Sequence, residues 1–427
     1  MSMRAFKIAA ATSAAFAGGF IATPASAQSA VDEIGLLNPL VREYRPIGVR
    51  LGDLTLYPDL DVGITHDSNI YAEPDNEKDD RIVNVTPRIT AELQRGTWQF
   101  RGLGQLNARR YLKYDSENST GAILEGDARF SPSEGQTFRG ALSFRRVIED
   151  RGDPEARDIP SRCEVDPVPS DCPSLSDGPR RLNVFRGELG YRRDVGVWFF
   201  GVNGTAAKNE NLAEADADRD YLSLAGQASV GRKIGGLTFA TVTAFANRRK
   251  FDREFDETGF QRDATTFGAR AGIQINSGGI FEGGASLGLF RFSADDARID
   301  DYTGISAAAD LIYRPTQRTA ILVDAFRGNV ATFRGGAVSR TDTRFRISAQ
   351  QEVRHNFFGR AALFTNQSKF RGSGVTERTT GVSGELEYLL TRYMSVAGGV
   401  RASKRNSDRP EDDFERFRAN AELRFHL

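Results

Sequence analysis

The chain contains only two cysteines, two tryptophans and three histidines among its 427 residues. So few cysteines and histidines leave little material for a metal centre or a redox site. Beyond the N-terminal region, no segment offers the ~20 consecutive apolar residues that a transmembrane helix needs. Lysine is also scarce, because 49 of the 57 basic residues are Arg, and the formal net charge is zero. These absences exclude an α-helical membrane protein and argue against binding to nucleic acid.

The three histidines are widely separated. His66 lies early in the chain, His355 lies in a predicted turn, and His426 is the penultimate residue. A hydrolase needs a nucleophile, or an activated water, beside a base. We expect neither a Gly-x-Ser-x-Gly nucleophile elbow nor a His-Glu-x-x-His zinc site. The sequence therefore predicts a protein that is not an enzyme, with no catalytic residue, no metal site and no cofactor.

Alternation of apolar and polar residues is what the chain has in abundance, and it is unbroken at the C-terminus. One face of the final segment holds Phe417, Ala419, Ala421, Leu423, Phe425 and Leu427, and the other holds Arg418, Asn420, Glu422, Arg424 and His426. A soluble sandwich strand can show this pattern, but a chain that ends on it is typical of the closing strand of a transmembrane β-barrel. We expect Phe425 and Leu427 to act as the signal that the barrel-assembly machinery recognises.

The N-terminus indicates export. Arg4 and Lys7 precede a weakly apolar run from Ile8 to Ala22, and Ala25-Ser26-Ala27 follows it. These are the parts of a secretory signal peptide, so we expect residues 1–27 to be removed. The alternative, an uncleaved anchor helix, requires a longer and more apolar run. Residues 28–50 are expected to form a periplasmic segment, and residues 51–427 the barrel.

Short and long connections alternate along the rest of the chain. The short turns are predicted at Arg95–Gly96, Ser131–Gln136, Arg193–Gly196, Lys233–Gly236, Asn276–Gly279, Arg314–Gln317, Arg354–Gly359 and Thr391–Arg392. With nine longer polar connections between them, they join about eighteen strands, and sixteen is the alternative count. The predicted fold is all-β, a transmembrane antiparallel β-barrel that is integral to a Gram-negative outer membrane and contacts its lipid and lipopolysaccharide.

The two cysteines, Cys163 and Cys172, lie in the longest polar connection, which runs from Asp150 to Arg181. In an oxidising compartment two nearby cysteines are expected to form a disulfide. The alternative, a redox or metal pair, lacks partner ligands in the sequence.

Acidic residues cluster in two other connections. Glu214, Asp216, Asp218 and Asp220 alternate in one, and Asp295, Asp296, Asp300 and Asp301 lie in the other. Carboxylates are suitable ligands for Ca²⁺ or Mg²⁺. A solvated acidic loop is the simpler interpretation, because no EF-hand spacing is present.

Arginine is the most informative residue type for function. Fourteen Arg are predicted to face the lumen, against eight acids on the same faces. The arginines are Arg88, Arg101, Arg109, Arg129, Arg139, Arg145, Arg186, Arg270, Arg344, Arg346, Arg401, Arg416, Arg418 and Arg424. Such an excess predicts a preference for anions or for carboxylate-bearing sugars. The alternative is that Arg–Glu ladders between neighbouring strands merely stabilise a polar barrel interior.

The start of the predicted mature chain carries a family resemblance. Residues 41–71 contain Pro46-x-Gly48, Gly52, Pro58 and the ending Asp67-Ser68-Asn69-Ile70-Tyr71, and Thr86-Pro87 follows an acidic loop. This stretch resembles the opening of the putative β-barrel porin 2 family of outer-membrane barrels. Because some members of that family are associated with exopolysaccharide secretion, the resemblance implies a passive pore for polysaccharide, with secretion components as partners. A general diffusion porin for small anionic solutes, and a structural or adhesive barrel with a blocked lumen, remain the alternatives.

Overall fold

The computed structural model describes residues 44–156, 178–256, 259–276, 279–334 and 337–427. Within them the chain is almost entirely β-strand, as the alternating sequence predicts. Three short 3₁₀ helices, η2 (Asp115–Glu117), η5 (Glu214–Arg219) and η6 (Pro410–Asp412), lie in connections between strands. Among the described residues, no helix has the length and hydropathy of a membrane span.

The strands are β1 (Val49–Leu51), β2 (Leu54–Asp67), β3 (Asp80–Arg95), β4 (Trp98–Tyr111), β5 (Ser119–Phe130), β6 (Gln136–Ile148), β7 (Arg181–Val195), β8 (Trp198–Asn211), β9 (Tyr221–Gly235), β10 (Thr238–Phe251), β11 (Ala264–Ile275), β12 (Phe281–Ala294), β13 (Tyr302–Thr316), β14 (Thr319–Val330), β15 (Ser339–Arg354), β16 (Phe357–Arg371), β17 (Thr376–Leu389), β18 (Met394–Ser407) and β19 (Phe414–His426).

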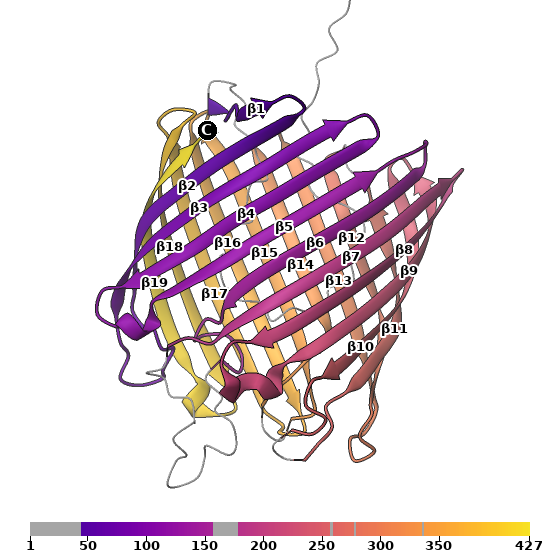
Figure 1. Ribbon diagram of the computed structural model, residues 1–427, viewed down its shortest axis with the longest axis vertical. Helices are drawn as coiled ribbons and strands as arrows, with labels where there is room; N and C mark the ends of the chain where they lie inside the picture. Colours follow the sequence, from indigo (N-terminus) through magenta and orange to yellow (C-terminus); the bar gives the residue numbers. More distant parts are fainter. Residues whose placement is uncertain (1–43, 157–177, 257–258, 277–278, 335–336) are drawn as a thin grey trace, which may run out of the picture.

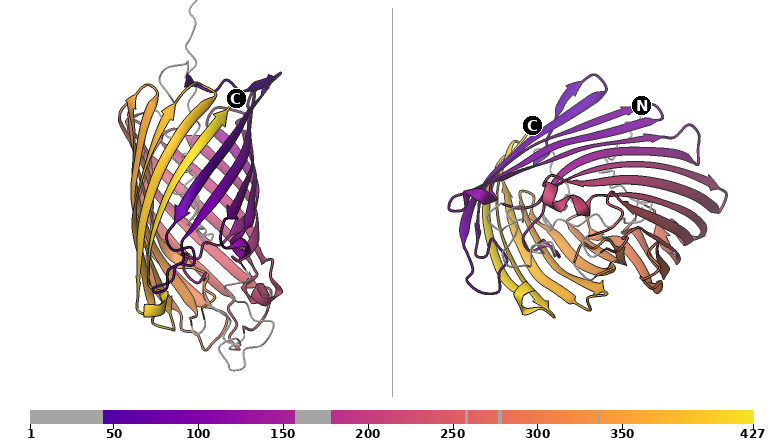
Figure 2. Two further views of the ribbon diagram at one scale, coloured as in Figure 1. Left: turned by 90° about the vertical axis from the view of Figure 1, so that its left-hand side faces the viewer. Right: turned by 60° about the horizontal axis from the view of Figure 1, so that its bottom comes forward.

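Strands β2 to β19 form a closed antiparallel barrel (Figures 1 and 2). Each strand pairs with the next along the chain, and β19 pairs with β2 from Arg418↔Asp67 to His426↔Asp59. The three-residue β1 pairs with the beginning of β2. Of the 19 strands in the described sheet, 18 therefore form the ring, which confirms the predicted fold class and the higher of the two strand counts.

Short turns join the strands at one end of the barrel and longer connections at the other. Gly96 and Gly196 lie in two-residue turns with φ of +58° and +59°. Such angles are readily adopted by glycine and are typical of tight hairpins. The C-terminus lies at the short-turn end (Figure 1), beside the start of β2. The long connections gather at the opposite end, which we call the long-loop end.

The outer surface of the barrel is apolar. Leu142 and Leu189 are 73% and 75% exposed, although both are in the middle of strands. Aromatic rings lie on this surface near the short turns, where Trp98 stacks on Phe130 and Phe281 on Tyr313. An apolar band with an aromatic girdle at its edge is the surface that a transmembrane barrel presents to lipid.

Candidate functional site: the barrel lumen

The inner surface is formed by the alternate positions of the same strands, and it is polar. Gln350 and Glu352 on β15 are each only 1% exposed, while Phe345 on the same strand is 44% exposed and faces outward. Charged side chains enclosed in this way need partners, because an unpaired buried charge is strongly unfavourable. The pairing of the inner side chains therefore determines which of them remain available to a solute.

The inner positions of β15 to β19 carry many charges, and we call this part the charged wall. Glu385 accepts hydrogen bonds from Arg360 and Arg424, with Arg424 Nη2 at 3.0 Å from Oε2. Glu387 lies 2.7 Å from Arg360 and 3.5 Å from Arg424. The charged residues of this wall are Arg340, Asp342, Arg344, Arg346, Glu352, Arg360, Glu377, Glu385, Glu387, Arg401, Arg405, Arg416, Arg418, Glu422 and Arg424.

Seven of the other predicted lumen arginines lie on β3 to β7, and Arg270 lies on β11. Arg88 Nε donates to Gln105 at 2.7 Å, and Arg139 Nε donates to Asp127 at 2.6 Å. Arg101 lies opposite Glu92 in the register. The remainder are Arg109, which lies opposite Asn84, Arg129, which lies opposite Arg139, Arg145, which pairs with Glu125, and Arg186, which pairs with Glu188.

On the charged wall, two arginines pack on aromatic rings instead of lying in a carboxylate pair. The Arg344 guanidinium lies 4.6 Å from the centre of the Phe326 ring, and Arg401 lies 4.4 Å from that of Phe364. Arg346 is opposite Asp324. Several carboxylates that face the lumen were not among the eight acids that the sequence placed on the inner faces. They are Asp59, Asp61, Asp67, Asp310, Asp324, Asp342 and Glu377. The inner surface thus holds more acid than the sequence count included.

Residues Asp150–Ala156, which follow β6, reach across the lumen at the long-loop end, and we call them the crossing segment. Asp150 accepts hydrogen bonds from Arg416 and Arg418 of β19, each at 2.6 Å. The same two arginines also donate to Asp67 at the end of β2. Burial tends to raise the pKa of Asp150, but Arg416 and Arg418 outweigh it and hold that pKa well below its usual range.

The far end of the crossing segment is held by Glu155. Its carboxylate accepts from Arg340 Nη1 at 2.6 Å, from the Phe333 amide at 2.8 Å, and from Thr332. Glu155 has a φ of +67°, which is uncommon for a residue other than glycine and persists only where several contacts hold it. The crossing segment is therefore tied to both β19 and β15 and narrows the lumen.

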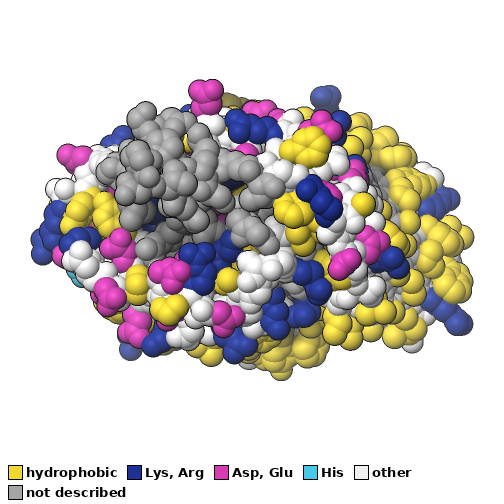
Figure 3. Space-filling model, turned by 90° about the horizontal axis from the view of Figure 1, so that it is seen from below, with side chains coloured by type: hydrophobic (Ala, Val, Ile, Leu, Met, Phe, Trp, Pro, Cys, Tyr) yellow, Lys and Arg dark blue, Asp and Glu magenta, His cyan; other side chains and the backbone are white. Residues whose placement is uncertain are grey.

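The connection between β14 and β15 completes this layer. Phe333 packs between Tyr221 of β9 and Phe251 of β10, with ring centres 6.2 Å and 6.3 Å away. Seen from the long-loop end (Figure 3), basic and acidic side chains are mixed over the surface and yellow apolar side chains follow the outer wall. Charges of both signs are thus present at this end.

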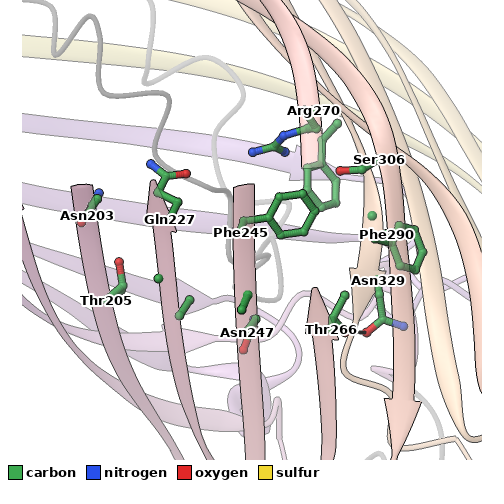
Figure 4. A pocket seen from close by; sticks show the side chains of 15 residues that line it. Asn203, Thr205, Gln227, Phe245, Asn247, Thr266, Arg270, Phe290, Ser306 and Asn329 are labelled. Atoms are coloured by element: carbon green, nitrogen blue, oxygen red, sulfur yellow. Dashed lines mark hydrogen bonds between the residues drawn. The ribbon is translucent and has the colours of Figure 1, made fainter. Parts of the chain in front are cut away.

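The inner positions of β8 to β11 differ, and we call them the neutral wall. They hold mostly Asn, Gln, Ser, Thr, Gly and Phe, with Lys233, Arg249 and Arg270 as charged members. A cavity with about 630 Å³ of empty space, partly open to solvent, lies between this wall and the adjoining strands β12 to β14 (Figure 4). Its polar lining includes Asn203, Thr205, Gln227, Asn247, Thr266, Arg270, Ser306 and Asn329.

Two sequence strings do not form sites. Gly284 to Gly288 spells Gly-x-Ser-x-Gly, but Ser286 lies in the middle of β12, whereas a nucleophile elbow needs a sharp strand-to-helix turn. In the acidic connections, carboxylates pair with arginine, as Asp216 does with Arg180 at 3.0 Å and Asp296 with Arg298. The described residues contain no group of three or more His, Cys, Asp or Glu that could hold a metal ion.

The remaining predicted residues lie at or beyond the barrel ends. Phe425 is 40% exposed on the outer face of β19, and Leu427 follows that strand with 53% exposure. The Leu427 amide donates a hydrogen bond to the Pro58 carbonyl at 3.1 Å. Cys163 and Cys172 lie outside the described residues, so their disulfide stays a prediction.

Sequence reasoning missed the crossing segment, with Asp150 and Glu155, and the grouping of polar residues in the cavity. The sequence placed Asp150 at the start of the longest polar connection, and no local signal distinguishes it from other acids in the connections. Alternation did place Arg270 inward, but only the ring order of the strands brings it beside residues that are distant in sequence, such as Asn203.

Comparison with solved structures finds large barrels at very low identity. A mutant ferric enterobactin receptor, PfeA, from Pseudomonas aeruginosa is 8% identical, with 87% of this chain and 80% of that chain covered and a TM-score of 0.41. The FrpB iron transporter from Neisseria meningitidis is 10% identical, with 89% and 82% covered and a TM-score of 0.42. The siderophore receptor PirA from Acinetobacter baumannii is 10% identical, with 87% and 80% covered and a TM-score of 0.40.

A comparison with curated proteins gives no match. The family comparison is informative, because the profile described as putative beta-barrel porin 2 matches residues 42–427. That match covers the complete ring of strands and extends the resemblance first seen in residues 41–71. The chain therefore belongs to the putative β-barrel porin 2 family.

Proposed function

We propose that this protein is a non-enzymatic outer-membrane pore through which polysaccharide is exported. The observation that carries the proposal is the neutral wall with its cavity, which amide and hydroxyl side chains line together with phenyl rings. A sugar chain presents many hydroxyl groups and apolar ring faces, and binding sites of this composition complement both.

A general porin for small anions is the second candidate, and the pairing of the arginines weighs against it. An anion-selective pore needs cationic side chains that a passing solute can approach. Arg139, Arg360, Arg416 and Arg424 instead have carboxylate partners within 3 Å. The described long-loop end is also narrowed by the crossing segment, which favours a regulated pore over an open diffusion channel.

The partners follow from the surfaces of the barrel. Lipid and lipopolysaccharide would contact the apolar outer face, and the barrel-assembly machinery would recognise the β19 strand with Phe425 and Leu427. Components of a polysaccharide-secretion system would meet the short-turn end, on the periplasmic side.

The proposal is tested with purified protein in planar bilayers and in liposomes that are loaded with labelled polysaccharide. We expect ion conduction that soluble oligosaccharides interrupt, and release of polysaccharide from the liposomes. Protein that inserts and heat-modifies normally but neither conducts nor releases polysaccharide would reject the pore and support a structural role. Conduction of small anions without any effect of oligosaccharide would support the diffusion porin.

A further inference from the structure

Arg270 is a buried arginine that lines the cavity of the neutral wall. It lies in the middle of β11, is 6% exposed, and stacks over Phe245 with 4.8 Å between the guanidinium carbon and the ring centre. Within the described part of the chain it makes no ion pair, and its Nε has no hydrogen-bond partner. Enclosing a guanidinium without an anion is unfavourable, so the position of Arg270 favours the binding of an anion from outside the chain.

The cavity around Arg270 contains no carboxylate that could serve as this anion. None of its lining residues is Asp or Glu. The nearby Glu188 accepts a hydrogen bond from Asn203 Nδ2 at 2.9 Å and lies 3.3 Å from Arg186, so it is already engaged. An anion at Arg270 would have to enter from the lumen, to which the cavity is open.

The other lining groups indicate what the anion is attached to. In Figure 4, Asn203, Gln227 and Asn247 lie on three adjacent strands, Phe245 lies on the same strand as Asn247, and Arg270 lies beyond it. Asn203 is 8% exposed, and its Oδ1 accepts no hydrogen bond in the described part of the chain. Amide groups in such a row match the hydroxyl groups of a sugar, and the phenyl rings of the same cavity offer apolar surface to a sugar ring.

We propose that this cavity binds a segment of an acidic sugar chain, in which one carboxylate pairs with Arg270 while hydroxyls along the chain bond to Asn203, Gln227 and Asn247. The proposal rests on the proposed function, since it names the polysaccharide that the pore takes as one containing uronic acids. Arg270 would provide the selectivity for charge, because a guanidinium binds a carboxylate with two parallel hydrogen bonds. The amide side chains that line the cavity would provide the affinity for the sugar.

The experiment measures binding of a tetramer of galacturonic acid to the purified full-length protein by calorimetry, with maltotetraose as the neutral probe. We expect tighter binding of the acidic tetramer, and a loss of roughly tenfold or more in Arg270→Gln, as for removal of one charged hydrogen bond. Binding of maltotetraose should change little. Lys233→Gln, which removes a charge at the short-turn end of β9 outside the cavity, should leave both affinities as they were.

A second variant guards against a simple loss of folding. Gln227→Glu keeps the size of the side chain and places a carboxylate on the cavity wall, so it should weaken the acidic tetramer while Arg270 stays in place. Equal binding of the acidic tetramer by the unmodified protein and Arg270→Gln would overturn the proposal. Inorganic sulfate that competes as strongly as the tetramer would overturn the sugar assignment. Arg270-dependent binding in a protein that fails to transport would uphold the site and reject only the export function.

Discussion

The charged wall and the neutral wall face one lumen but use their polar groups differently. On the charged wall many charges bond to one another, as Glu385 does with Arg360 and Arg424, although both carboxylate oxygens of the buried Glu352 lack a hydrogen-bond partner among the described residues. On the neutral wall, the groups around the cavity include an unpaired guanidinium and an unpaired amide oxygen. Paired charges stiffen a wall, whereas unpaired groups are available to a ligand. The neutral wall places its unpaired groups around one cavity and is therefore the better candidate for recognition.

The crossing segment extends the comparison, because Asp150 and Glu155 both dock on the charged side. Asp150 bonds to β19, and Glu155 bonds to β15 and to the connection before it. The charged wall thus serves as the anchor for the element that narrows the lumen. The neutral wall lies across from that anchor in the ring order of the strands.

The largest effect should come from releasing the crossing segment. Asp150→Asn together with Glu155→Gln removes the carboxylates that bond to Arg416, Arg418 and Arg340. Each charged hydrogen bond is worth about 1.5–3 kcal/mol, so the segment should leave its docked position. We expect single-channel conductance in planar bilayers to increase severalfold.

The matched control for this double variant is Asp301→Asn, which removes an exposed pair with Arg291 at the long-loop end. It should leave the conductance unchanged. If the double variant inserts normally and conducts like the unmodified protein, the crossing segment does not limit passage.

A feature of this barrel could be predicted from the sequence when it depends on residues that are close together along the chain. The eighteen strands and all eight short turns followed from alternation and turn residues, which are local properties, and Gly96 illustrates this. The inward direction of Arg344 or Arg416 followed for the same reason. The bond between Asp150 and Arg416 joins residues 266 positions apart, and no pattern near either residue encodes it. Pairing decides the role of a lumen charge, so function was less predictable than fold.

A smaller effect should distinguish the two walls by stability. Glu385→Gln leaves Arg360 and Arg424 without one of their carboxylate partners, and breaking a buried ion pair destabilises proteins by about 3–5 kcal/mol. Thr243→Val on the neutral wall removes one hydrogen bond to Ser229, of about 1 kcal/mol. We expect Glu385→Gln to lower the temperature of heat-modified migration on gels more than Thr243→Val does. Equal shifts would mean that the charged wall is not held by its ion pairs.

The smallest effect should be that of pH on conductance between pH 7 and about pH 5, where few carboxylates titrate. The pKa of Asp150 is lowered in the docked state, so its contribution to docking is complete above the ordinary pKa of Asp, about 3.9. That contribution is lost only as the pH falls through the lowered value. Burial raises the pKa of the neighbouring Glu149, so acidification favours its enclosed, neutral form and also supports docking.

Both groups therefore keep the crossing segment in place as the pH falls from neutral. The unmodified protein should conduct equally at the two pH values, and the Asp150→Asn, Glu155→Gln variant should conduct more at both. If mild acid increased the conductance of the unmodified protein, Asp150 would be losing its charge at a pH far above the lowered pKa that Arg416 and Arg418 impose. The two arginines would then have to be held by Asp67 alone, with which both also bond. If pH has no effect on conductance but the double variant conducts more, the ion pairs hold the crossing segment in place at both pH values.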